Sequence, residues 1–245
     1  MKHLLRTGLA ASAVLLAATA AQAQISFGPR VGLNATTLNY DFKDDDEPES
    51  KLMLGAQVGL SMNAQFGKLS LQPSLLFTMK GDKYEESESE TVNMGNGPET
   101  FSYESKRSLR LNYLELPVNL VYSTNGAEGG FQVFAGPYVA LGLGGKAKSE
   151  SKSIFTSNGQ TITRSSSDDS DVKFVSKEGD DDDAYVRALD AGFNLGLGYK
   201  VSSVQVQLGY GLGLGNLIPK DEDGKDPEDK VRNRGFQLSL AYFFN

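Results

Sequence analysis

Apolar and polar side chains alternate along most of this chain in stretches of about 10 to 15 residues. A period of two is typical of β-strands, because successive side chains of a strand point to opposite faces. The pattern predicts an all-β protein with eight antiparallel strands and no long amphipathic helix. The predicted strands are approximately Ser26 to Tyr40, Lys51 to Asn63, Leu69 to Lys80, Arg107 to Tyr122, Gly130 to Lys146, Val186 to Val201, Ser203 to Asn216 and Gly235 to Phe244.

The connections between these strands alternate strictly between long and short. Short turns are expected at Ala64 to Gly67, Ser123 to Gly129 and Ser202. The long connections hold 28 of the 31 acidic residues, so that almost all negative charge lies outside the strands. In an up-and-down barrel with an even number of strands, this order places all long loops at one rim and all short turns at the other. The four long segments are 41–50, 81–106, 147–185 and 217–234, and runs of like charge predict that they are mobile or partly disordered.

The polar face of the strands indicates which way each side points. It carries Gly, Gln, Ser and Asn and few charges, whereas a water-exposed face usually carries Lys and Glu. The apolar face has about six bulky side chains per strand, more than the interior of an eight-stranded barrel can hold. We therefore expect the apolar set to face lipid and the polar set to face the barrel axis. The prediction is a closed, eight-stranded, antiparallel, up-and-down transmembrane β-barrel.

Outward-facing aromatic residues gather near the rim of the short turns, as expected for an interfacial girdle. They are Phe27, Tyr122, Phe131, Tyr199, Tyr242 and Phe244.

The first 23 residues have the pattern of a cleavable signal peptide. Lys2 and Arg6 precede an apolar run from Gly8 to Ala20, and Ala21-Gln22-Ala23 is a small-x-small cleavage site. The predicted domains are therefore a signal peptide at 1–23 and a barrel at 24–245. The chain has no cysteine, which excludes disulfides, thiolate metal sites and a lipidated cysteine.

Four segments carry motifs of a known family: Leu111 to Tyr122, with Tyr-Leu-Glu-Leu-Pro, Phe131 to Ala140, with Ala-Gly-Pro-Tyr, Phe27 to Asn34 and Gly235 to Phe244. They resemble the PorT-like outer-membrane β-barrel family that is common in Bacteroidetes. The resemblance implies an eight-stranded, porin-like barrel that the outer-membrane assembly machinery inserts, and it covers nearly all of the mature chain. The founding member of the family is associated with protein secretion, but nothing in this chain points to secretion.

Catalysis is not expected, because the only histidine is His3, within the predicted signal peptide, and no Ser-His or Cys-His device can form. The same inventory predicts no histidine-rich or cysteine-rich metal site and no cofactor. Inside the barrel, Arg30, Glu115 and Asp190 share the inward parity. We expect a buried network of charges there that has a structural role, with a charged constriction controlling ions as the alternative. Glycines of the sixth and seventh predicted strands should make room for Tyr113, Tyr138 and Phe243.

The sequence favours a non-enzymatic outer-membrane protein, monomeric, with a structural or surface-binding role through its extracellular loops. A pore for small solutes or ions and an accessory part of a secretion complex are the alternatives. Outer-membrane lipid and the barrel assembly machinery are the expected partners. Divalent cations at the acidic loops are a possible third, and the negative net charge of -7 argues against nucleic acid. The candidate cation clusters are Asp44 to Glu47, Asp180 to Asp183 and Asp221 to Gly224.

Overall fold

A computed structural model describes residues 24–43, 50–94, 97–157, 159–177, 184–221 and 223–244. The predicted signal peptide, residues 1–23, lies outside the described residues. One sheet contains ten strands, two more than the alternation predicted. They are β1 (Gln24–Asp41), β2 (Lys51–Phe66), β3 (Leu69–Met94), β4 (Gly97–Ser123), β5 (Gly129–Ser157), β6 (Gln160–Val175), β7 (Ala184–Arg187), β8 (Leu189–Val201), β9 (Val204–Gly213) and β10 (Lys230–Tyr242).

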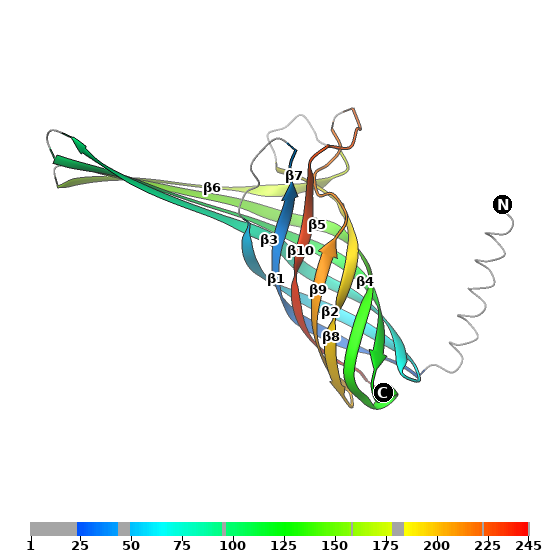
Figure 1. Ribbon diagram of the computed structural model, residues 1–245. Helices are drawn as coiled ribbons and strands as arrows, with labels where there is room; N and C mark the ends of the chain where they lie inside the picture. The colour runs from blue at the N-terminus through cyan, green and yellow to red at the C-terminus, as the bar shows by residue number, and fades with distance from the viewer. Residues whose placement is uncertain are drawn as a thin grey trace.

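Eight of these strands pair in a ring, which we call the wall. The order β4-β3-β2-β1-β10-β9-β8-β5 returns to its start through the pairing of β4 with β5, and every neighbouring pair is antiparallel. The first and last strands of the chain are joined over a long register, from Arg30↔Ala241 to Asp41↔Lys230. The wall therefore uses the eight stretches that the sequence pattern identified (Figure 1).

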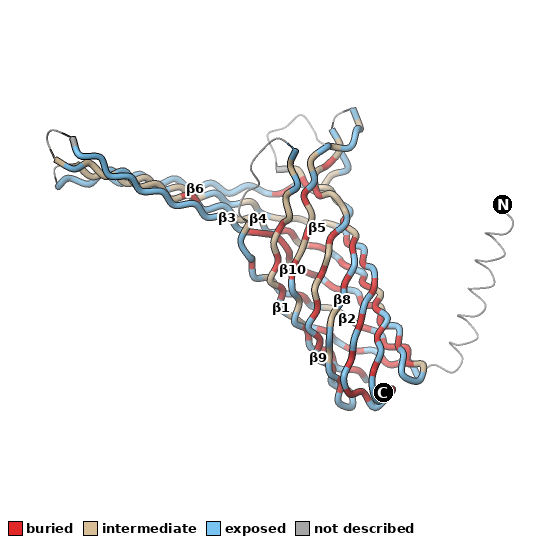
Figure 2. The backbone as a smooth tube through the Cα atoms, viewed as in Figure 1, coloured by how far each residue is buried: buried red, intermediate tan, exposed pale blue. Residues whose placement is uncertain are grey.

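The two faces of the wall point as the sequence predicted. In β9, Gln205 and Gln207 are buried, whereas Val206 and Leu208 between and beyond them are exposed. The same alternation runs along β1, β2 and β8, and buried and exposed residues follow one another along the wall in Figure 2. The amide and hydroxyl side chains fill the interior of the ring, and the aliphatic side chains cover its outside. The six aromatic residues predicted for the girdle are all exposed.

Short turns at one rim connect the wall strands in pairs. Gly67 and Lys68 join β2 to β3, Ser202 and Ser203 join β8 to β9, and a short 3-10 helix, η1 (Gly126–Glu128), lies between β4 and β5. Ser202 takes a positive φ of 51°, as a tight hairpin turn requires. These are the three short turns that the sequence predicted.

Two of the four segments predicted as long mobile loops at the other rim, 81–106 and 147–185, are instead largely β-structure where they are described, which corrects the sequence interpretation of these two. The described residues of 217–229 form no strand, and residues 44–49 lie outside the described residues. β3 and β4 stay paired far beyond the wall, to Met94↔Gly97, and β5 and β6 stay paired to Ser157↔Gln160. β4 and β5 remain paired along this extension, to Glu99↔Ser157. The four strands form one projecting sheet, seen on the left of Figure 1, which we call the arm (residues 84–107 and 149–168, where described).

The arm is a single layer of sheet that is open to solvent on both faces. All twelve residues from Gln160 to Asp171 of β6 are exposed (Figure 2). At a rise of about 3.3 Å per residue, the eleven positions from Tyr84 to Met94 extend the sheet by roughly 33 Å. Among the described residues, no helix has the length and apolar character to cross a bilayer.

Candidate functional site in the interior of the ring

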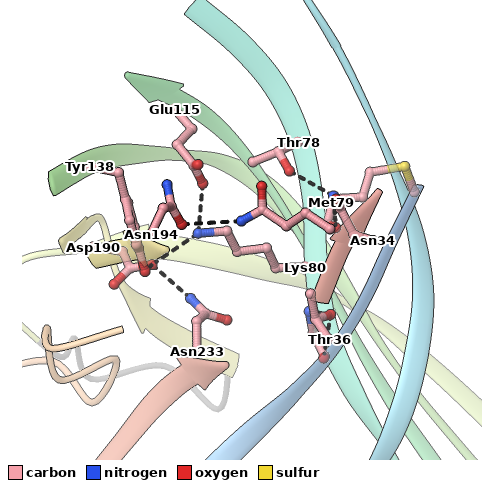
Figure 3. Close-up of polar contacts among 12 residues, drawn as sticks. Asn34, Thr36, Thr78, Met79, Lys80, Glu115, Tyr138, Asp190, Asn194 and Asn233 are labelled. Carbon is pink, nitrogen blue, oxygen red and sulfur yellow. Dashed lines mark hydrogen bonds and ion pairs between the residues drawn. The ribbon is translucent and has the colours of Figure 1, made fainter. Parts of the chain in front are cut away.

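A lysine that the sequence analysis did not single out lies at the centre of the buried charges. Lys80 of β3 places its Nζ 2.7 Å from Oε2 of Glu115 on β4 and 3.4 Å from Oδ2 of Asp190 on β8. Figure 3 shows the lysine side chain reaching between the two carboxylates. All three side chains are at least nine-tenths buried, so each charge depends on the others for stabilisation. Three strands of the wall thus meet at one ammonium group.

Asp190 of β8 also accepts hydrogen bonds from the adjacent strand β5 and from β10, two strands away in the ring. Its Oδ2 accepts hydrogen bonds from Nδ2 of Asn233 at 2.9 Å and from the Tyr138 hydroxyl at 3.2 Å. The Tyr138 ring also lies 4.2 Å, centroid to Nζ, from Lys80, which adds a cation–π contact. The carboxylate therefore links β3, β5, β8 and β10, as Figure 3 shows. Such a node fixes the positions of strands that are far apart in the sequence.

Arg30 of β1 is also buried, but it does not join this node through an ion pair among the described residues. Its charge interacts with that of Glu115 over a longer distance, and its Nε finds no hydrogen-bond partner within the described part of the chain. Of the three residues predicted from parity, Glu115 and Asp190 meet at one cation, while Arg30 stands beside them. Lys80 has the same inward parity as Gln72 and Thr78, so the alternation in β3 held the signal that would have found it.

A layer of amide side chains lies between the charges and the short turns. Nε2 of Gln205 donates to Oε1 of Gln132 at 2.7 Å, and Nε2 of Gln132 donates to the Ser123 hydroxyl at 2.8 Å. Nε2 of Gln72 donates to Oδ1 of Asn63 at 2.8 Å. These hydrogen bonds join neutral side chains of adjacent or next-but-one strands, so that part of the polar interior is satisfied by its own groups.

An apolar cap closes the ring on the side of the arm. Val172 of β6, Val186 of β7 and Leu217 fold inward and are buried with Leu111 and Tyr113 of the wall. The Phe174 ring packs edge-on against the Tyr113 ring, with centroids 5.4 Å apart. Backbone hydrogen bonds from Arg187 N to Leu217 O (2.7 Å) and from Leu217 N to Val231 O (2.8 Å) hold the two inward segments together. The sequence analysis missed this cap because it assigned these residues to acidic loops or to strand ends.

The interior beside Lys80 has almost no free space. Its cavity measures about 10 Å³ and is lined by Lys80, Tyr138, Asn233 and their neighbours, which is close to the minimum for one water molecule. Tyr113, Tyr138 and Phe243 are buried, as predicted for residues that fill the space left by glycines. A Cβ on Gly192 would lie 2.6 Å from Cε1 of Tyr138, so the tyrosine ring occupies the room that this glycine leaves.

The acidic clusters considered for divalent cations are only partly described. Residues 44–49 and 178–183 lie outside the described residues. In the third cluster, Lys225 donates to both aspartates. The backbone N–H of Lys225 donates to Asp221 Oδ1 at 2.7 Å, and Nζ of Lys225 donates to Asp223 Oδ2 at 2.9 Å. No group of three or more metal-ligating side chains occurs within the described part of the chain. Cation binding at the acidic segments stays a prediction.

The fold and the polar interior place this chain among β-barrel proteins, and comparison with known proteins gives the family. Residues 20–219 match the family described as outer membrane protein beta-barrel domain. The chain therefore belongs to this family and is an outer-membrane β-barrel protein. The comparison with curated proteins finds no match.

Among solved structures, the chain is similar to Ail, the attachment invasion locus protein of Yersinia pestis, with 12% identity and a TM-score of 0.36. That match covers 90% of this chain and 99% of Ail. Neisserial surface protein A gives 13% identity and a TM-score of 0.35, with 90% and 99% covered. The outer membrane channel DcaP of Acinetobacter baumannii gives 9% identity and a TM-score of 0.22, with 91% and 97% covered. At such scores these likenesses leave the function open.

Proposed function

We propose that this protein is a closed, eight-stranded transmembrane barrel without enzymatic activity, whose arm is a binding element on the cell surface. The observation that carries the proposal is the arm itself, a paired sheet about 33 Å long with both faces in solvent. Sheet of this length adds nothing to closing the ring. It places side chains far from the rim, where a partner outside the cell can reach them.

The arm carries apolar side chains that a purely solvated sheet does not need. Phe101, Phe155 and Ile162 are cross-strand neighbours in one row on one face, and each remains exposed. Glu90 continues the same row on the edge strand β3. Exposed apolar residues in a contiguous group are typical of an interaction surface, and the adjoining carboxylate of Glu90 favours a partner with positive charge. We therefore expect the arm to bind a cationic surface that also has apolar groups.

The interior supports a plug rather than a pore. The apolar cap, the Lys80 node and the amide layer occupy successive levels of the ring, and the free volume beside Lys80 is about 10 Å³. In planar bilayers we expect no conductance above that of protein-free controls. A stepwise conductance would favour the pore alternative.

We also propose the surroundings, the assembly route and the oligomeric state of the protein. Outer-membrane lipid would cover the aliphatic outside of the wall, the barrel assembly machinery would insert the chain, and the protein would be a monomer. The PorT-like resemblance is kept as a finer assignment within the family. A secretion role has no supporting feature among the described residues.

Single cysteines test the placement of the arm, because the chain has none of its own. Ser102→Cys places a thiol on the arm, and Lys68→Cys places one in a short turn. In intact cells, a membrane-impermeant maleimide should label the arm variant, and it should label the turn variant only after the outer membrane is permeabilised. Labelling of the turn but not of the arm would reverse the orientation and exclude the proposed role.

Attachment of cells tests the binding role. Cells that produce the protein should attach to polylysine-coated surfaces with apolar side groups more strongly than cells with a Phe101→Ser, Phe155→Ser variant. Val139→Ser on the wall, whose side chain is 48% exposed, is the matched control and should not change attachment. Equal attachment by all three proteins would contradict a role for the apolar row.

A further inference from the structure

A cavity much larger than the one beside Lys80 lies where the wall passes into the arm. Its volume is about 570 Å³, within the roughly 300–1,000 Å³ typical of small-molecule sites. Residues of β1, β3, β4, β5 and β6 line it. On β3 the lining residues Asp82 and Tyr84 continue the inward parity of Lys80, so the cavity lies beyond the apolar cap, on the side of the arm.

The floor of this cavity is apolar. Tyr40, Leu109 and Ala147 line it, and all three are half-buried against the apolar cap. Leu109 and Ala147 are direct cross-strand partners of β4 and β5, so their side chains are neighbours. The cavity can therefore cover the apolar part of a small ligand.

Asp82 is a buried carboxylate without a counter-cation. Only 5% of the residue is exposed, and the hydroxyls of Tyr40 (2.9 Å) and Ser50 (3.0 Å) both donate to its Oδ2. Its Oδ1 accepts no hydrogen bond within the described part of the chain, and no lysine or arginine there pairs with the carboxylate. A buried charge is costly unless it is paired, so this side of the cavity is suited to a cation.

The other charges of the lining also favour a cation. Glu86 and Asp168 add two exposed carboxylates further out on the arm. The lining holds two cations, Arg107 and Lys148, and both are exposed. Lys148 pairs with Glu150, whereas Arg107 forms no ion pair among the described residues. Three carboxylates against one unpaired arginine attract a positive ligand, and the apolar floor suits an organic ion better than a metal ion.

We propose that this cavity binds an organic ammonium ion with an apolar body. The ammonium group pairs with Asp82, and the apolar body lies on Leu109 and Ala147 beside the Tyr40 ring. Asp82, Leu109 and Ala147 follow one another in a single cross-strand row. Neighbouring side chains of such a row are about 5 Å apart, so an ammonium that two carbons separate from an aromatic ring can contact the carboxylate and the floor together. The site does not depend on the attachment role proposed for the arm.

Calorimetric titration of the whole purified protein in detergent micelles tests the proposal, with phenethylamine as the probe and protein-free micelles as the blank. Phenethylamine should bind saturably at a single site with a Kd near or below about 1 mM. 2-Phenylethanol lacks the charge and ethylamine lacks the apolar body, so each should bind at least about 10-fold more weakly. Absence of saturable binding by phenethylamine would overturn the proposal without any variant. Equal binding by either of the other two compounds would overturn the part of the ligand that it lacks.

Phenylalanine tests the net charge that the cavity selects. It has the same ring and ammonium group as phenethylamine and an added carboxylate, which the three carboxylates of the lining repel. It should therefore bind more weakly than phenethylamine. If it binds as tightly or more tightly, Arg107 accepts the carboxylate, and the assignment to a simple ammonium ion is wrong.

Variants test the role of the buried carboxylate. Asp82→Asn keeps an oxygen for the Tyr40 and Ser50 hydroxyls but removes the charge, and it should weaken phenethylamine binding about 10-fold or more. Glu85→Gln removes an exposed carboxylate on the opposite face of the same strand and should leave the affinity unchanged. Equal affinity of the two variants overturns the role of Asp82. A gel-mobility shift on heating reports whether each variant is folded, and the ligand series on the parent protein decides the proposal if Asp82→Asn does not fold.

Discussion

The wall and the arm share three strands but have opposite surroundings. β3, β4 and β5 run without interruption from one region into the other. In the wall, one face of each strand is buried among side chains from the other strands. In the arm, both faces of the sheet are exposed to solvent. The difference arises from ring closure, because only a closed ring gives a strand an interior to fill.

The comparison extends to the charges. The wall buries Lys80 with Glu115 and Asp190, whereas the arm and its base hold exposed pairs such as Lys51 with Glu85 and Lys148 with Glu150. A buried charge without its partner is expensive, while exposed pairs contribute little. Identical kinds of substitution should therefore have very different costs in the two regions.

The largest effect is expected from removing the buried cation. Lys80→Met leaves two buried carboxylates without their ammonium and should lower the free energy of unfolding by about 3–5 kcal/mol. The midpoint of urea unfolding, followed by the gel-mobility shift, measures this. Lys148→Met on an exposed pair is the control and should leave the midpoint unchanged. If both variants unfold at the same urea concentration as the parent, the buried node does not hold the wall together.

The next effect tests what surrounds the outer face. Leu208 on the wall and Ile162 on the arm are exposed to nearly the same extent, 54% and 57%. Leu208→Lys should destabilise the protein by about 2–4 kcal/mol, because the charge would enter hydrocarbon. Ile162→Lys should have almost no effect, because its side chain faces water. Unfolding of the lipid-reconstituted protein gives both values, and similar costs would show that the two outer faces share one solvent.

A smaller effect is expected from packing inside the wall. Gly192→Ala places a methyl group against the Tyr138 ring and the adjoining strand, and such overpacking costs about 1–3 kcal/mol. Gly144, at the end of the wall near the arm, has open space where a Cβ would lie. Gly144→Ala should therefore be neutral or slightly stabilising. The same unfolding assay compares the two, and a tolerated alanine at 192 would mean that Tyr138 moves aside without cost.

The wall could be predicted from the sequence because its alternation is hydrophobic. Leu208 between Gln207 and Gly209 signals a strand and also indicates which side faces the interior of the ring. The inward parity of Glu115 and Asp190 was also readable, and Lys80 was overlooked only because it stands at the end of its predicted strand. The position of Arg30 beside the node, rather than in it, depends on distances that no pattern contains.

The arm could not be predicted in the same way. Its strands alternate Ser, Thr and Glu, residues that are equally typical of solvated loops. It is held by cross-strand pairing, including hydroxyl contacts between Ser89 and Ser102 (2.8 Å) and between Thr91 and Thr100 (3.0 Å). Such pairs cannot be identified from the sequence unless the register between β3 and β4 is known. The apolar cap was missed for a related reason, since Val172 stands alone between Asp171 and Lys173 and no alternation marks it as buried.

The smallest expected effect concerns pH at the rim near the arm. Asp226 accepts a hydrogen bond from Arg187 at 2.9 Å and lies 3.4 Å from Lys220, and these two cations lower the pKa of its carboxyl below the ordinary 3.8. Because the folded pKa is depressed, the stabilisation is present above pH 3.8 and is lost as the pH falls through the lowered value. Hydrogen exchange of the segment around Leu217, which Arg187 joins through its backbone, should speed up in that acidic range. In Asp226→Asn this local pH dependence should disappear while exchange in the wall stays unchanged. An equal acid response in the variant would assign the effect to other carboxylates of the rim.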